Sequence, residues 1–404
     1  MTTDALKTGA LKTEGFGVFA YHTDNEAYSE TAIPNFMFNQ QVKYVGSDWT
    51  YSPLKYWPNE FGSTASSNQI DYLTFFAYAP WVDAEAKTGI VANTTDTSTG
   101  IIGFSRNTTK GDPFVKYAID FNPAKCVDLC WGVANANFSS SVDGTENTVL
   151  KDQTFINVKK PKTGDVIRFN FKHALAALNV QIDADVDAES PTHTTNVEGT
   201  TRIYVRSVTF EGFAAKGALN LNSDATSLPT PIWYDVLGLT QLSTAPVTLF
   251  DGRKDGREGV SNGAATYEMP QGLNTKLVQI DKNTQDGVQK EAVNLFNSAT
   301  ESAPIYVIPT GQNMKVTIVY DVETVDDKLP TFISDGKTHG SVVENVITKE
   351  IVDGSSDPIV LESGKLYTIS LHLGMTSVKF EATESTWPTA PGEAADADLP
   401  INKE

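Results

Sequence analysis

Cysteine is scarce in this chain of 404 residues, which has only Cys126 and Cys130. Two cysteines cannot build the disulfide framework that holds many small secreted domains together. On an extended strand, residues four positions apart lie roughly 13 Å from each other, which is too far for a disulfide unless the chain turns between them. We therefore expect two buried thiols that pack as small apolar side chains.

Long apolar runs and an export signal are also absent from the sequence. No stretch approaches the roughly 20 apolar residues that cross a bilayer as a helix. The start, Met1-Thr2-Thr3-Asp4, lacks the basic segment and the apolar run of a secretion signal. Because such signals are removed from mature proteins, this start fits a cytoplasmic protein and a processed surface protein alike.

Positive charge is in short supply. The chain has 50 Asp and Glu residues against 31 Lys and Arg residues, which gives a formal net charge of -19. A protein that binds DNA or RNA needs a basic patch to overcome such a field, and the sequence shows none. A nucleic-acid partner is therefore not expected.

Motifs for metal, nucleotide or nucleophilic chemistry are missing as well. The five histidines lie far apart, with no HExxH or HxH pattern among them. No G-x-S-x-G elbow, P-loop or complete dinucleotide-binding glycine motif occurs. The sequence predicts no catalytic residue, no cofactor and no metal site, so an enzyme is not expected. Two carboxylates that the fold brings together, as in glycosidases, stay an open alternative.

One histidine, His173, continues an alternating apolar pattern. His173 follows Ile167, Phe169 and Phe171 at alternate positions, which places its imidazole on the apolar face of a strand. We favour a core histidine that bonds a backbone carbonyl over a ligand or a catalytic group.

Acidic residues gather in three places that could attract calcium. Asp183, Asp185, Asp187 and Glu189 alternate with apolar residues, so a continuing strand would present four acids on one face. Two loops, DGRKDGREG and DKNTQDG, are also acidic, but both lack the EF-hand register. A solvated face and solvated loop tips are the favoured interpretation, and calcium binding stays open.

Apolar and polar residues alternate in several segments, as half-buried strands require. The clearest examples are 314–322 and 367–373. Segments 15–21 and 71–80 are apolar at nearly every position, so we expect strands that are buried on both faces.

Turn residues between such segments predict two hairpins. The first joins 41–45 to 49–51 through a three-residue turn, and the second joins 367–373 to 378–382.

Helix signals are scarce, because Gly and Pro interrupt the chain throughout. Only short helices at 174–178 and 292–298 are expected. Many short strands joined by long loops predict an all-β fold with two tandem β-sandwich domains.

Composition suggests where the domains divide. The polar segment 159–165 contains Pro and Gly and lies between strand-like runs. We place an N-terminal β-sandwich domain at 1–162 and a C-terminal one at 163–387. Residues 388–404 are rich in Pro, Ala and acids, which predicts a flexible acidic tail.

Aromatic residues crowd the first half of the chain: Trp49, Tyr51, Tyr56, Trp57 and Trp81. An exposed row of them would bind sugar rings or a protein partner. Aromatic residues that fill the core and line hairpins are the favoured interpretation.

Five segments occur in an order that matches a known family: KTEGFGVFAYHT, IDYLTFFAYAPW, DLCWG, FNFKHALAALNVQI and GKLYTISLHLGMTSVKFEATESTW. Each alone is a common strand pattern, whereas the ordered set spans most of the chain. Together they resemble the fimbrillin-like (Mfa-like) family of fimbrial and surface proteins from Bacteroidales. Cys130 departs from the aliphatic residue that is more usual there.

The resemblance implies a structural or adhesive subunit of a donor-strand-assembled bacterial fimbria, or pilus, without catalysis. Its fold would be two transthyretin-like β-sandwich domains. Family members are exported to the cell surface as outer-membrane lipoproteins and trimmed at the N-terminus after an Arg. They polymerise when a strand of one subunit fills the groove vacated in the next. No Arg precedes Arg106, so we expect the chain to begin close to the trimming point, with a non-native Met1.

Expected partners are other fimbrial subunits, either copies of this chain or minor pilins. Host or bacterial surface ligands, including glycans, are further candidates. Membrane contact would come only through an N-terminal lipid anchor outside this chain.

The resemblance also indicates residues for assembly. The candidate donor strand presents apolar side chains at alternate positions: Val378, Phe380 and Ala382. The candidate acceptor groove is lined by three side chains of the first strand: Phe16, Val18 and Ala20. A plain terminal hairpin explains residues 378–382 equally well.

A second function keeps the same architecture without polymerisation. A surface carbohydrate-binding lipoprotein would be favoured if Trp49, Trp57 and Trp81 formed an exposed row.

Overall fold

A computed structural model gives the fold of most of the chain. It describes residues 8–24, 26–58, 71–83, 98–142, 145–159, 166–186, 201–223, 232–235, 241–251, 293–295, 304–329, 339–353 and 355–375. Within these ranges the structure is nearly all strand, with one α-helix, α1 (Thr8–Glu14), and a single-turn 3₁₀ helix at Pro123–Lys125. The predicted all-β fold class is confirmed. No helix in these ranges is long and apolar enough to cross a membrane.

The first sheet is antiparallel and built around two fully buried strands. Its spatial order is β11-β7-β4-β1-β2-β3, and β10 also pairs with β4. The strands are β1 (Phe16–His22), β2 (Met37–Val45), β3 (Asp48–Thr50), β4 (Leu73–Ala79), β7 (Cys130–Ala134), β10 (Phe155–Val158) and β11 (Phe169–His173). Nearly every residue of β1 and all of β4 are buried, as their continuous apolar sequences predicted.

A second sheet packs on one face of the first. Its order is β16-β15-β6-β5, and its strands are β5 (Gly100–Phe104), β6 (Phe114–Ala118), β15 (Lys216–Asn220) and β16 (Trp233–Tyr234). Aromatic rings join the two layers, since Phe104 lies with its centroid 5.8 Å from that of Phe19 and 5.1 Å from that of Tyr78. The two sheets therefore share a sandwich core. A separate hairpin pairs β8 (Phe138–Val142) with β9 (Thr145–Val149).

Two further sheets form from later parts of the chain. The third has the order β14-β19-β12-β18, with β22 parallel to β12. Its strands are β12 (Ala176–Val186), β14 (Phe213–Ala214), β18 (Val293–Asn294), β19 (Ile305–Pro309) and β22 (Leu366–Met375). The fourth has the order β17-β13-β20-β21, with strands β13 (Thr201–Glu211), β17 (Val247–Asp251), β20 (Lys315–Val325) and β21 (Gly340–Glu350).

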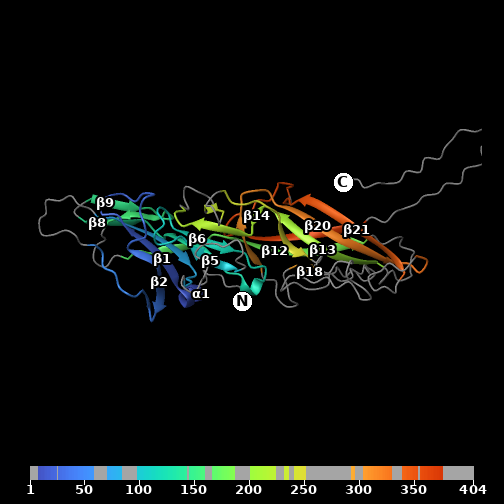
Figure 1. Cartoon of the computed structure of the whole chain (residues 1–404), viewed down its shortest axis with the longest axis horizontal. Helices are drawn as coiled ribbons and strands as arrows, with labels where there is room; N and C mark the ends of the chain where they lie inside the picture. The colour runs from blue at the N-terminus through green and yellow to red at the C-terminus, as the bar shows by residue number, and fades with distance from the viewer. Residues whose placement is uncertain are drawn as a thin grey trace, which may run out of the picture.

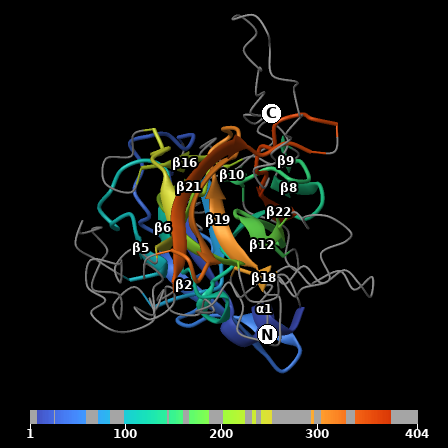
Figure 2. The same ribbon diagram turned by 90° about the vertical axis from the view of Figure 1, so that its right-hand side faces the viewer.

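The sheets are arranged along an elongated molecule. Strands β1, β2, β8 and β9 lie toward one end, and β13, β20 and β21 toward the other (Figure 1). Seen along the long axis, β21 of the fourth sheet lies to one side and β12 and β22 of the third sheet to the other (Figure 2). One apolar cluster contains buried residues of all four sheets, among them Phe76, Tyr117, Leu178 and Ile318.

The chain passes repeatedly between the two ends. Strands β11, β15 and β16 follow the predicted domain boundary at 162/163, yet β11 pairs with β7 and β15 pairs with β6. Strand β13 precedes β15 in sequence and belongs to the fourth sheet. The two-domain division stays a prediction, and a cut at this boundary would separate these strands from their partners.

Three local predictions are wrong. The segment 174–178 enters strand β12 instead of a helix, because Ala176 to Leu178 pair with β19 and Ala177 onward pair with β22. Residues 293–294 form β18, not helix. The strand that was predicted to end at Leu373 continues to Met375 as part of β22.

The first predicted hairpin is present, with β2 pairing with β3. Val45 pairs with Asp48, so the turn contains two residues, Gly46 and Ser47, instead of three. The partner strand predicted for the second hairpin, 378–382, lies outside the described residues.

Candidate functional site

The predicted acceptor residues all lie on one face of β1. Phe16, Val18 and Ala20 alternate with Phe19 and Tyr21, so period two directs the two sets to opposite faces of the first sheet. Phe19 and Tyr21 belong to the sandwich core, whereas the other three lie in a second buried cluster on the outer face. Strand β1 pairs with β2 along one edge and with β4 along the other. The acceptor residues are therefore presented through the face of the sheet, not through a free strand edge.

An aromatic layer covers much of this outer face. We use the name for Phe16, Trp49, Phe155, Phe169 and Phe171. The Phe16 ring lies 5.1 Å from the Trp49 ring and 5.2 Å from the Phe171 ring, and Phe155 lies 5.2 Å from Phe169. Trp49 is 40% exposed, so the layer reaches solvent at this residue. Phe16, Phe155 and Phe171 are buried, so most of the layer packs inside the protein beside the predicted acceptor residues.

The aromatic residues considered for sugar binding have different surroundings. Tyr56 is 84% exposed. Trp57 packs against the outer-face cluster, and the Trp81 indole donates a hydrogen bond to the carbonyl of Asn39 at 3.2 Å. Trp49 stacks in the aromatic layer. Trp49, Trp57 and Trp81 thus each pack against a different set of neighbours, whereas Tyr56 is exposed.

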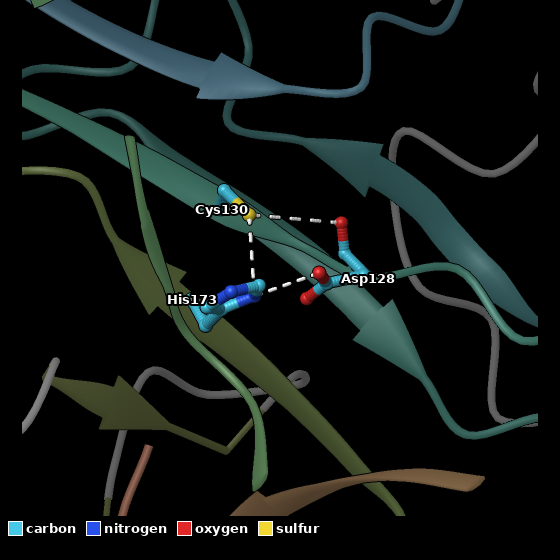
Figure 3. A group of neighbouring side chains, drawn as sticks. All are labelled: Asp128, Cys130 and His173. Atoms are coloured by element: carbon cyan, nitrogen blue, oxygen red, sulfur yellow. Dashed lines mark hydrogen bonds and ion pairs between the residues drawn. The ribbon is translucent and has the colours of Figure 1, made fainter. Parts of the chain in front are cut away.

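A second site joins three polar side chains across two paired strands. Cys130 begins β7 and lies directly opposite His173, the last residue of β11. Asp128 precedes Cys130 by two positions, so both side chains lie on the same side of the extended chain. The His173 Nδ1 lies 2.7 Å from Asp128 Oδ2 and 3.9 Å from Cys130 Sγ, and this sulfur lies 4.0 Å from the backbone oxygen of Asp128 (Figure 3). We refer to these residues as the Asp–Cys–His cluster.

Burial differs strongly within the Asp–Cys–His cluster. The Asp128 side chain is 2% exposed, Cys130 is fully buried, and the His173 side chain is 29% exposed. The close partner of His173 Nδ1 is the Asp128 carboxylate, where the sequence predicts a backbone carbonyl. This carboxylate lies in the segment that precedes β7 and bonds the ring at a position that the strand pattern assigns to an apolar face.

The cluster does not have the geometry of a nucleophilic triad. In a triad the carboxylate holds one imidazole nitrogen and the nucleophile contacts the other. Here both the carboxylate and the thiol converge on the same nitrogen, Nδ1 of His173. The arrangement is that of three donor atoms around a common point, and these atoms all lie within 4.8 Å of one another.

Another group of possible ligands lies at the far end of β1. His22 Nε2 lies 3.3 Å from Asp71 Oδ1 and 3.5 Å from Asp24 Oδ1. The Asp71 side chain is almost completely buried, and its Oδ2 makes no hydrogen bond within the described ranges. This group consists of one imidazole and two carboxylates, without sulfur.

Cys126 and Cys130 are both buried, as predicted. Burial raises the pKa of the Cys126 thiol to about 12, and its Sγ lies 3.0 Å from the backbone oxygen of Asp120. Cys126 therefore stays a neutral thiol near pH 7 and acts as a packing group.

These observations define an all-β scaffold with a buried aromatic face and no assembled triad among the described residues. Comparison with known proteins finds similarity to fimbrial and adhesive proteins. Over its whole length the chain is similar to the fimbrium subunit Fim1C from Phocaeicola vulgatus, with 24% identity over 418 residues that cover 100% of this chain and 87% of Fim1C. The predicted resemblance to Bacteroidales fimbrial proteins is confirmed. No protein-family model matches the chain.

Solved structures of similar proteins carry related descriptions. A fimbrial protein from Bacteroides vulgatus is 21% identical, with a TM-score of 0.47 and coverage of 91% of each chain. A putative cell adhesion protein from Bacteroides uniformis is 12% identical, with a TM-score of 0.31 and coverage of 88% of this chain and 86% of that one.

Sequence reasoning missed the Asp–Cys–His cluster and the His22 group. The sequence predicts Cys130 as an apolar packing residue and His173 as a core histidine on the apolar face of a strand. Only the register between β7 and β11 shows that the three side chains meet. Val378, Phe380 and Ala382, the predicted donor residues, lie outside the described residues.

Proposed function

We propose that this chain is a structural or adhesive subunit of a bacterial fimbria and that it works at the cell surface without catalysis. The observation that carries the proposal is the similarity to Fim1C, a fimbrium subunit, across the full length of the chain. The ordered segments of the fimbrillin-like pattern support the same role. Its partners would be other fimbrial subunits, with surface ligands or glycans as additional targets.

We further propose that subunits join by donor-strand addition. An added strand would pair with an edge strand of the first sheet and direct its alternate apolar side chains toward the outer face, where Phe16, Val18 and Ala20 lie beside the aromatic layer. Extended-strand recognition combines backbone hydrogen bonds with pockets for alternate side chains. The alternating residues Val378 and Phe380 provide that pattern near the C-terminal end.

Electron microscopy of negatively stained samples tests this proposal. The full chain, a version truncated after Met375 and a full-length Phe380→Asp variant are compared at high concentration. Truncation after Met375 leaves β22 intact, and the substitution keeps the length while placing a charge in the proposed apolar contact, where desolvation is unfavourable. We expect filaments from the full chain and few or none from either variant.

Thermal unfolding followed by circular dichroism serves as the control that all three proteins are folded. Filaments that persist in both variants would contradict assembly through residues 378–382. Compact monomers from the full chain would contradict self-polymerisation and favour the non-polymerising, carbohydrate-binding surface lipoprotein.

A further inference from the structure

The Asp–Cys–His cluster has the donor atoms of a transition-metal site. It brings together one carboxylate oxygen, one sulfur and one imidazole nitrogen, each from a different side chain. We propose that Asp128, Cys130 and His173 bind one divalent ion of the zinc class, which includes Zn²⁺ and Co²⁺. This site is independent of the proposed fimbrial role.

The spacing of the donor atoms suits tetrahedral coordination. Zinc bonds of about 2.0–2.3 Å at tetrahedral angles place neighbouring donor atoms roughly 3.3–3.8 Å apart. The distance of 3.9 Å between Cys130 Sγ and His173 Nδ1 is close to this range. The 2.7 Å between Nδ1 and Asp128 Oδ2 is a hydrogen-bond length, and it would open by roughly half an ångström when a metal replaces the shared proton.

The choice of metal follows from the ligands. Thiolate and imidazole favour zinc and its neighbours over calcium and magnesium, which prefer oxygen ligands alone. Three protein ligands leave one tetrahedral position for water, and solvent reaches the imidazole because 29% of the His173 side chain is exposed.

The charges of the proposed ligands also match a divalent ion. Asp128 and Cys130 are buried, and once bound to a metal they would carry two negative charges, which a buried site tolerates only beside a cation. A divalent ion neutralises both. The backbone already holds the ligands in position, since Ala174 N donates to Leu129 O at 2.8 Å directly beside the cluster.

The Asp–Cys–His cluster lies where the chain passes from the first sheet to the third. His173 ends β11, and the chain then passes through Ala174 and Leu175 into β12 of the third sheet. Ala174 O accepts hydrogen bonds from the Trp233 indole and the Ser363 hydroxyl, and Leu175 O accepts one from Gly364 N. A metal bound to His173 would therefore restrict the motion of the segment that connects the first sheet to the third.

Cobalt titration of the full chain tests the proposal. The protein is kept reduced with a phosphine, freed of metal with a chelator and titrated with Co²⁺. We expect one equivalent to produce near-ultraviolet thiolate-to-cobalt absorption together with visible bands of tetrahedral Co²⁺, and Zn²⁺ to displace both. Zn²⁺ should also raise the Tm of the metal-free protein by binding the folded state.

Matched variants assign the signal to its ligands. Cys130→Ser should abolish the thiolate absorption, and His173→Gln should weaken Co²⁺ binding by at least the roughly 10- to 100-fold that changes outside the ligand set cost. Cys126→Ser removes the other buried thiol, which lies outside the cluster, and should leave the absorption unchanged. His22→Asn removes the sulfur-free group at the end of β1 and should also leave it unchanged.

Absence of thiolate absorption in the folded wild-type protein would overturn the proposal, whatever the variants do. Absorption that survives in Cys130→Ser but disappears in Cys126→Ser would overturn it too. Zn²⁺ binding that is lost only in His22→Asn would assign the metal to the other group instead.

Discussion

At the scale of single residues, buried tyrosine hydroxyls hold the first sandwich together. Tyr78 donates a hydrogen bond to Asn39 Oδ1 at 2.6 Å, and Tyr117 donates one to the carbonyl of Val127 at 2.7 Å. Burial raises the pKa of both hydroxyls well above the usual value for tyrosine. The neutral hydroxyl is therefore part of the folded state at every pH near neutrality.

The raised pKa of Tyr78 predicts a loss of stability in alkali. An unfolded tyrosine ionises near pH 10, whereas Tyr78 keeps its proton in the folded state. The protonated Tyr78 hydroxyl contributes its full stabilisation below pH 10. Above pH 10, the free energy of unfolding falls by about 1.4 kcal/mol per pH unit for each such group. Tyr78→Phe cannot ionise, so its free energy of unfolding should decrease less steeply between pH 10 and 11 than that of the wild type.

Urea denaturation at pH 9, 10 and 11 measures these slopes. At pH 9, Tyr78→Phe should be about 1 kcal/mol less stable than the wild type, because the hydrogen bond to Asn39 is missing, and this difference should shrink toward pH 11. Tyr56→Phe is the matched control, since Tyr56 is 84% exposed, and it should follow the wild-type slope. Equal slopes for Tyr78→Phe and the wild type would contradict this account.

At the scale of elements, the pairing of β1 with β4 depends on a close approach between Gly17 and Tyr78. The two residues are direct partners in the antiparallel register. A Cβ atom added at Gly17 would lie 2.1 Å from Cε1 of the Tyr78 ring and 2.9 Å from Asn39 Oδ1. The ring of one strand thus occupies the space that any side chain at position 17 would need.

Gly17→Ala should therefore destabilise the protein by about 1–3 kcal/mol, the usual effect of overpacking. Urea denaturation measures the change, and a double-mutant cycle tests its cause. In a Tyr78→Ala background the ring is gone, so the same Gly17→Ala substitution should have a much smaller effect. An equal effect in both backgrounds would show that the clash with Tyr78 is not the reason.

The strands themselves were largely predictable from the sequence. Alternation at 314–322 predicted β20, and the continuous apolar runs predicted β1 and β4, because side-chain period and burial are local properties. Segment 174–178 misled the prediction because Ala and Leu have high helix propensity. Pairing with β19 and β22 overrides that propensity.

The sites were less predictable than the strands. The acceptor residues came from a family resemblance, and the structure places them on a buried face of a strand that is paired along both edges. The Asp–Cys–His cluster needs the register of β7 against β11, which brings together residues about 45 positions apart in the chain. Local periodicity carries no information on such a register.

At the scale of the whole molecule, one core runs through all the sheets. The largest apolar cluster contains Phe19 and Phe104 of the first sandwich together with Leu371 of the third sheet and Phe210 of the fourth. Strand pairing crosses the predicted boundary as well, since β15 extends the second sheet beside β6. The elongated shape in Figure 1 is thus built from sheets that share one core and that combine strands from both sides of the predicted boundary.

This shared core predicts a single cooperative unfolding transition, even though the chain is long enough for two domains. Fragments 1–162 and 163–404 would each lose partners: β7 would lose β11, and β6 would lose β15. We expect differential scanning calorimetry of the full chain to show one transition, with a calorimetric enthalpy equal to the van't Hoff enthalpy. Neither fragment alone should give a cooperative transition, because each would expose unpaired strand edges and apolar surface. Two well-separated transitions that match those of the fragments would instead support the tandem domains predicted from the sequence.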